Sequence, residues 1–292
     1  MVDDPSIEDL SDELAQELSL NTAEAAFVDP RSIPSRFSLL KQMALSPAHY
    51  RHAAQQPQDD SFAARLAGLV PPGTKRSDAL RFGTAAHALL FKTGTVGVYT
   101  GARRAGPEWK RFQQEAADRG HVEILNAREY VLAVDVIDAI CRNETAIELL
   151  FADTIVEQRL DWKWEDREFR STPDARSKKI GGHLVDLKTA QSSQPTAFMR
   201  HAMRYWYHAQ AALYCEALES LDLGTPSACY LIAVEKTKPH PVTVVEITPE
   251  VVEQGRKSCR LWFEQLKNCE ASNVWPEYVQ RIVPWELEEN AA

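Results

Sequence analysis

The 292-residue chain is predicted to fold as an α/β protein in which helices flank a mixed β-sheet and a helical part comes first. Apolar residues recur at helical spacing through the first half of the chain, and short β-rich runs separated by turn residues follow after residue 153. Helices first, and then strands mixed with helices, are typical of a layered α/β fold.

Acidic side chains are concentrated at the two ends of the chain. Residues 1–30 contain nine acidic residues and no Lys or Arg, and three more glutamates lie in the last eight residues. Residues 31–284 hold 33 basic and 30 acidic side chains, so the net charge of −9 does not exclude a nucleic-acid partner. We interpret residues 1–30 as a disordered acidic leader; the alternative is an acidic arm that competes with DNA for a basic groove.

Composition also limits where the protein is expected to act. No apolar run approaches the roughly 20 residues that span a bilayer, and the N-terminus lacks the features of a signal peptide. The five cysteines are scattered and never form a CxxC pair, which favours free thiols over disulfides or a zinc site. We therefore expect a cytoplasmic protein with no membrane partner.

Residues 31–287 are predicted to form one domain after the leader. Its helical part, residues 31–152, is expected to begin with a helix from Ser35 toward Ala48, followed by irregular or weakly helical chain over 55–73. A helix opened by Ser77 and Asp78, a long loop over 93–107 and a long helix capped by Asn126 are expected to follow. Its core, residues 153–287, is expected to contain strands over 154–161, 167–176 and 183–188, a helix over 195–220, strands over 228–235 and 241–247, and a last helix from Thr248 to about Asn268.

Two aspartates and a lysine in this core suggest the chemistry. If strands 167–176 and 183–188 pair as a hairpin, Asp174 faces Asp186 with Cβ atoms roughly 4.5–5.5 Å apart. Two carboxylates so close repel each other, and a divalent cation between them would make the arrangement favourable. Because side chains alternate along a strand, Lys188 lies on the same face as Asp186. The pattern predicts a site that binds a metal and positions a water.

These acidic residues also have an ordinary structural interpretation. For the two aspartates it is a set of salt bridges to the basic side chains of residues 176–179. Glu157, on the preceding strand, is a further candidate ligand, and its alternative is a surface ion pair with Arg159 or Lys163. The spacing of a Pro-Asp pair and a later Asp-x-Lys is moderately specific, because such short patterns recur by chance.

Several motifs resemble one nuclease family. STPDARSKKIGGHLVDLKTA resembles motifs II and III of the PD-(D/E)XK nucleases, and MRYWYHAQAALY resembles their QxxxY element. SPAHY, GTAAHALLF, LIAVEKTKPHPV and the Trp-Pro and Pro-Trp pairs near the C-terminus are similar to the RecE-type exonuclease VIII family of phage-type recombination nucleases. The similarity covers residues 35–287 in unbroken order, and linked motifs are more specific than any one alone.

The resemblance implies a restriction-endonuclease-like core and a role for each motif residue. Asp174 and Asp186 are implied to hold the metal together with the backbone carbonyl of Leu187, and Lys188 is implied to be the catalytic lysine. His87 falls on the family's upstream histidine and is implied to complete the metal site. Without the family, a lone histidine on a helix of small residues is more often a core residue.

Gln210 and Tyr214 match the QxxxY element. They are four residues apart and share one helical face with Tyr207. The resemblance suits a role in positioning the DNA strand or the lysine, and the alternative is an ordinary packing stripe.

The function that the resemblance implies is Mg²⁺-dependent hydrolysis of linear double-stranded DNA from its ends, with Mn²⁺ as a possible substitute. It implies 5′-to-3′ degradation that leaves 3′ single strands for a single-strand annealing protein in recombination and repair, and a ring-shaped homo-oligomer. Two alternatives stay open. One is a structure- or sequence-specific endonuclease on the same core, and the other is a non-catalytic DNA-binding or interaction module.

Overall fold

The structure is a computed structural model that describes residues 34–56, 64 and 77–278. The predicted acidic leader and most of the predicted irregular segment over 55–73 lie outside the described residues. Within the described part of the chain, no helix combines the length and the apolar character needed to cross a bilayer.

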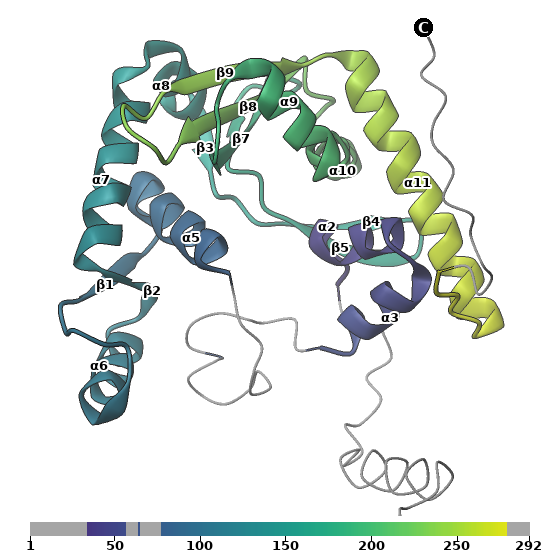
Figure 1. The fold of residues 1–292 in the computed structure, drawn as a ribbon. Coiled ribbons are helices and arrows are strands. Elements are labelled where there is room, and N and C mark those ends of the chain that lie inside the picture. Colours follow the sequence, from purple (N-terminus) through teal and green to yellow (C-terminus); the bar gives the residue numbers. More distant parts are fainter. Residues whose placement is uncertain (1–33, 57–63, 65–76, 279–292) are drawn as a thin grey trace, which may run out of the picture. The chain divides into compact units, whose positions relative to one another are not determined.

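A five-stranded mixed sheet forms the centre of the fold (Figure 1). The strand order is β3-β6-β7-β8-β9, with β7 and β8 parallel and every other neighbouring pair antiparallel. The strands are β3 (Thr154–Val156), β6 (Ala175–Ser177), β7 (His183–Ala190), β8 (Ala228–Glu235) and β9 (Val242–Ile247).

Helices cover both faces of this sheet, and side-chain alternation along β7 divides the core into two layers. Leu184 packs into the layer that includes α10 and α11, whereas Val185 and Leu187 pack into the layer that includes α5, α7 and α8. The predicted α/β fold with a mixed sheet between helices is confirmed. The covering helices are α5 (Asp78–Phe91), α7 (Ala127–Arg142), α8 (Glu144–Phe151), α9 (Pro195–Arg204), α10 (Tyr207–Ser220) and α11 (Pro249–Ser272).

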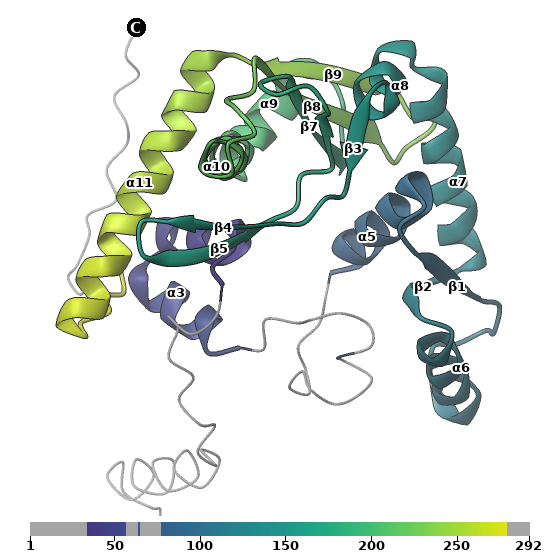
Figure 2. The same ribbon diagram turned by 180° about the vertical axis from the view of Figure 1, so that it is seen from behind.

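The remaining elements extend this core. The antiparallel hairpin β4–β5 lies beside α11 (Figure 2). Trp164 of this hairpin stacks on Phe263 of α11 with ring centroids 4.9 Å apart. Strands β1 and β2 form a separate parallel pair beside α6. The bounds are α2 (Phe37–Leu40), η2 (Lys41–Ala44), α3 (Pro47–Ala54), β1 (Thr95–Tyr99), α6 (Gly106–Asp118), β2 (His121–Asn126), β4 (Leu160–Trp164) and β5 (Arg167–Ser171).

Several local predictions are confirmed. Ser77 caps α5 by accepting a hydrogen bond from the backbone of Leu80, and Asn126 forms a capping box with Glu129 at the start of α7. In the β6–β7 hairpin, Ala175 pairs with Val185, which is the register that the sequence predicted.

Two predicted strands are wrong in their extent. The strand over 154–161 is divided between β3 and β4, because Glu157 leaves the strand with a φ of 48°. The strand over 167–176 is divided between β5 and β6, and Pro173, which lacks a backbone donor, lies in the gap.

Predictions for the helical segments also need correction. The helix over 195–220 is divided into α9 and α10, because Trp206 has a φ of 62°. Ser35 caps no helix; it is extended and bridges to Phe169, and Ser46 caps α3 instead. The predicted loop over 93–107 contains β1, whose partner strand is distant in sequence.

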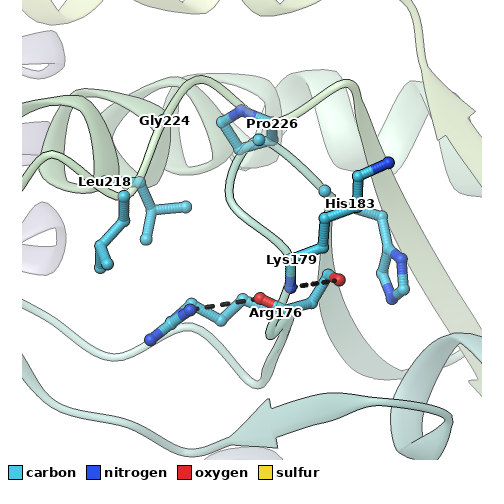
Figure 3. Close-up of a pocket in the computed structure, with 10 residues that line it drawn as sticks. Arg176, Lys179, His183, Leu218, Gly224 and Pro226 are labelled. Atoms are coloured by element: carbon cyan, nitrogen blue, oxygen red, sulfur yellow. Dashed lines mark hydrogen bonds between the residues drawn. The ribbon is translucent and has the colours of Figure 1, made fainter.

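The turn between β6 and β7 is fixed by the loop that leads into β8. Gly181 donates its backbone N–H to the carbonyl of Leu223 (3.1 Å) and accepts one from Ser227 (3.0 Å). Beside these contacts is a cavity of about 10 Å³ between Arg176, His183 and the loop (Figure 3). That volume is at the lower limit for one water, so the cavity is too small for a substrate.

Helices α10 and α11 lie in close contact at Gly255. A Cβ atom there would lie 2.3 Å from the carbonyl oxygen of His208. We expect Gly255→Ala to lower the free energy of unfolding by about 1–3 kcal/mol, because overpacking outweighs the gain of about 1 kcal/mol in helix propensity.

Gly83→Ala is the matched control for this prediction. Gly83 is also in a helix, but a Cβ atom there would lie no closer than 3.8 Å to Thr189. We expect this substitution to be neutral or to stabilise by about 0.5–1 kcal/mol. Urea unfolding measures both, and equal stabilities for the two variants would contradict the close approach at Gly255.

Candidate metal and catalytic site

The site lies where β6 and β7 begin to separate. Asp174 directly precedes β6, and the register of the hairpin places it next to Asp186 of β7. Its Oδ2 accepts a hydrogen bond of 2.5 Å from the backbone N–H of Leu187, and its own carbonyl accepts one of 3.0 Å from Glu157. Both aspartates are buried, with 7% and 6% of their surface exposed. The break before β6 therefore turns Asp174 inward beside the end of β3.

His87 reaches this group from α5, which covers the face of the sheet opposite to α10. Its Nε2 lies 3.1 Å from the carbonyl oxygen of Leu187, and its Nδ1 lies 3.3 Å from Glu157 Oε1 and 3.4 Å from Asp174 Oδ1. One potential ligand atom from each of His87, Glu157 and Asp174 lies within 4.8 Å of the others. The structure thus brings together four groups that the sequence suggested as metal ligands.

Both ring nitrogens of His87 face oxygen acceptors, which only the protonated imidazolium can satisfy as a donor on each side. Burial opposes this charge, but the carboxylates of Asp174 and Glu157 outweigh burial and raise the pKa of His87 to about 10. Burial also works against ionised Asp174, and there the positive His87 outweighs it, so the pKa of Asp174 is lowered. A cation is therefore required among these carboxylates, and His87 supplies it.

Asp186 lies outside this four-group cluster and faces Lys188. Its Oδ2 is 2.5 Å from Lys188 Nζ. Burial, reinforced by the charge of Asp174, raises the pKa of Asp186 to about 6 in spite of the lysine. Burial opposes the charge on Lys188 as well, but Asp186 and Asp174 outweigh it and raise the pKa of Lys188. Lys188 is therefore a cation at neutral pH.

Helix α10 holds the ammonium group of Lys188 in place. Lys188 Nζ donates to Gln210 Oε1 (3.1 Å), and Gln210 Nε2 donates to the Tyr214 hydroxyl (2.8 Å). Of the two residues predicted to share a helical face, Gln210 contacts the lysine and Tyr214 contacts Gln210. Burial raises the pKa of Tyr214 well above its usual value, so the hydroxyl stays neutral and can accept from Gln210.

Sequence reasoning assigned no role to two residues beside Lys188. The ammonium lies 4.7 Å from the ring centroid of Tyr207, a cation–π contact that the shared face with Gln210 could have suggested. Lys41 of η2 is the second: burial lowers its pKa, and the charge of Lys188 lowers it further. No local signal marks Lys41, because packing of distant segments brings it near.

The alternative ion pairs do not form in the described residues. Arg159 pairs with Asp161, Lys178 pairs with Asp153, and Arg176 donates to Gln158. The basic side chains closest in sequence to Asp174 and Glu157 are therefore directed elsewhere, and His87 and Lys188 neutralise the buried carboxylates.

This fold and site define a domain of the PD-(D/E)XK class. Residues 37–283 match the family described as "PDDEXK-like domain of unknown function (DUF3799)", and the chain belongs to that family. The narrower resemblance to exonuclease VIII is not part of this match. No curated protein matches the chain in sequence.

Among solved structures, the chain is similar to a "putative exonuclease" from Eubacterium rectale, with a TM-score of 0.57 and 12% identity over 92% of this chain and 95% of that one. At that identity the likeness shows the fold alone. A second structure, that of SSO0001, has a TM-score of 0.28 and 11% identity over 75% of this chain and 96% of that one, and it carries no argument.

The PD-(D/E)XK class implies a divalent metal, and the donors present fit one. An imidazole nitrogen, two carboxylates and a backbone carbonyl converge, and in the structure they share a single positive charge on His87. Hard divalent cations prefer oxygen donors, with imidazole as an acceptable nitrogen ligand. A bound metal would take the place of the His87 proton.

We expect millimolar Mg²⁺ or Mn²⁺ to raise Tm, and to raise it more at pH 8 than at pH 5.5. Protons compete with the metal at His87 up to about pH 10 and at Asp186 up to about pH 6. The stabilisation that protonated His87 gives the metal-free protein is full below its unfolded pKa near 6.5 and is lost as the pH rises through about 10. The metal-free protein has therefore lost part of this stabilisation at pH 8 but not at pH 5.5, and a bound metal can replace the lost part. We expect a rise of roughly 3–10 °C at that pH, measured by differential scanning fluorimetry.

Asp174→Asn tests the assignment of this site, and Asp161→Asn is its control, because Asp161 is exposed and paired with Arg159. The first variant should lose the metal-linked rise in Tm and the second should keep it. An Asp174→Asn protein that gains as much as the wild type would contradict the metal site.

Proposed function

We propose that the chain is a metal-dependent exodeoxyribonuclease that hydrolyses phosphodiester bonds of linear double-stranded DNA. One observation carries this proposal: half-buried Lys188, held by Gln210, lies beside Asp186 on β7, the strand whose Leu187 carbonyl contacts the cluster of Glu157, Asp174 and His87. A metal site with an adjacent fixed cation can neutralise the charge of a phosphodiester undergoing hydrolysis. Membership of the PDDEXK-like family supports a nuclease, and the description of the structural neighbour supports an exonuclease.

The metal site would be formed by His87, Glu157, Asp174 and the carbonyl of Leu187, with Asp186 as a further ligand once it is ionised. A divalent metal held by these groups would polarise the scissile phosphate and lower the pKa of a bound water. Mg²⁺ suits the oxygen donors, and Mn²⁺ suits the same set with the imidazole.

Lys188 contributes positive charge. Its raised pKa disfavours a role as the base that deprotonates water, so we assign it to the charge that develops on the phosphate. Gln210 and Tyr207 hold the ammonium group in a fixed position, which limits the reorganisation needed during the reaction.

Further parts of the proposal come from the resemblance to exonuclease VIII and remain predictions. They are 5′-to-3′ polarity, a 3′ single strand passed to an annealing protein, and a ring-shaped homo-oligomer around the DNA. The cytoplasm is the expected location, and recombination and repair are the expected processes.

Incubation of linear and covalently closed circular DNA with Mg²⁺ tests the activity directly. We expect the linear DNA to be degraded from its ends and the closed circle to persist, and end-labelled DNA gives the polarity. Cleavage of the circle would favour an endonuclease on the same core. Failure to cut either substrate with Mg²⁺ or Mn²⁺ would favour a non-catalytic module.

Lys188→Ala should lower the single-turnover cleavage rate by roughly 10²–10³-fold or more, because it removes charge stabilisation that acts in the transition state. The metal-linked rise in Tm should persist, because Lys188 repels a bound cation and its removal takes that repulsion away. Lys188→Arg should not restore the rate, because the planar guanidinium places its charge differently.

Lys178→Ala is the matched control, because Lys178 is exposed and pairs with Asp153. Its cleavage rate should stay close to that of the wild type. A Lys188→Ala protein that cuts linear DNA at near the wild-type rate would rule out the assignment of the active site.

A further inference from the structure

The connection between α9 and α10 places two tyrosine rings beside each other. In an uninterrupted helix, residues 205 and 207 would be about 200° apart around the axis and would face opposite sides. Here α9 ends at Arg204, and Trp206 has a φ of 62°, which is uncommon for a bulky residue. As a result the rings of Tyr205 and Tyr207 have centroids only 6.2 Å apart.

This break is held in place from the protein interior. The Trp206 ring packs edge-on against Trp262 of α11, with centroids 4.9 Å apart, and tilts against His208 at 5.6 Å. A left-handed conformation at a non-glycine residue costs of order 1–3 kcal/mol and persists where surrounding packing imposes it. The fold thus accepts local strain at the turn that aligns the two tyrosines.

The aligned rings lead from the candidate catalytic lysine to the surface. Lys188 Nζ lies 4.7 Å from the Tyr207 centroid, and the Tyr207 hydroxyl lies 3.4 Å from His201 Nε2. His201 stacks on Tyr205, with centroids 4.3 Å apart and planes inclined by 29°. Tyr205 is 45% exposed, so this series of rings ends at solvent.

The charge and chemistry of the same surface fit a nucleic-acid strand. Residues 191–215 contain Arg200 and Arg204 and no acidic residue. Both arginines are exposed, and neither forms an ion pair with another described residue; the Arg204 guanidinium lies 6.0 Å from the Tyr205 ring centroid. Met199 and Met203 of α9 are 45% and 47% exposed, which adds apolar surface beside the rings.

We propose that Tyr205 and His201 form a stacking platform for a nucleobase of the strand whose phosphate lies at Lys188. This inference rests on the proposed function. Aromatic faces interleaved with arginines bind unpaired nucleotides, because every base offers a π-face and every linkage carries a negative charge. Since Tyr207 connects Lys188 to this platform, the stacked base belongs to a nucleotide near the scissile bond. A base stacked there is withdrawn from its complementary strand, so the platform acts on frayed or separated DNA ends.

The test walks a single abasic site through the terminal nucleotides of each strand of a linear duplex. Single-turnover cleavage with Mg²⁺ at increasing protein concentration gives the half-saturating concentration for each substrate. Removal of the stacked base should raise that concentration for the wild type by roughly 5- to 100-fold at one position. Tyr205→Ala should show a similar rise on intact DNA and little further rise with the abasic site at that position, because both changes remove one contact.

Two variants control this result. Tyr205→Phe keeps the ring and should behave like the wild type. Tyr278→Ala removes another exposed tyrosine, which packs on His49 with centroids 5.4 Å apart, and should also leave the half-saturating concentration unchanged.

The outcomes separate the platform from the nuclease activity. If the wild type cuts DNA and Tyr205→Ala matches it on every substrate, the platform is overturned while the nuclease stands. Fully additive losses from Tyr205→Ala and the abasic site would also overturn it, and would leave the exposed rings as a surface for a protein partner. If the wild type cuts no DNA, anisotropy with the same duplexes in EDTA decides. Weaker binding with the abasic site at one position would then support the platform without the nuclease activity. Absence of DNA binding would overturn both proposals.

Discussion

Charge balance around Asp174 and Asp186 is the constraint on which the site depends. Asp174 and Asp186 are almost fully buried, and an ionised carboxylate is tolerated there only beside a cation. His87 supplies one cation from α5, on one face of the sheet, and Lys188 lies under α10, on the other face. Both helical layers must therefore be packed on the sheet before the carboxylates are neutralised. The site is therefore complete only when the helices on both faces of the sheet are in place.

Much of the fold could be predicted because its signals are local. The caps at Ser77 and Asn126 and the apolar run of β8 lie within a few residues of the structure that they specify. The breaks at Glu157 and Trp206 could not be predicted, since their positive φ angles are imposed by contacts with distant segments. The same applies to β1, which pairs with a strand that begins more than 20 residues later.

Some residues of the candidate site could likewise be placed from the sequence, and others could not. Hairpin register and strand alternation were enough to place Asp174, Asp186 and Lys188 together. The position of His87 followed only from the resemblance, because no periodicity connects a helix to a carbonyl 100 residues away. The position of Asp186 outside the cluster of His87, Glu157 and Asp174 depends on exact side-chain positions in the packed core, which the sequence pattern does not specify.

The parallel pairing of β7 with β8 has a consequence for synthesis. Parallel neighbours need a crossover, and here α9 and α10 form it, so the ribosome completes β7 well before β8. Until then β7 has an open edge, and the helix that carries Gln210 has no finished sheet to pack on. The helix α11, which packs on α10, is made later still. A nascent chain therefore has no complete central sheet before β8 and β9 are made, and α10 gains its contact with α11 only after that.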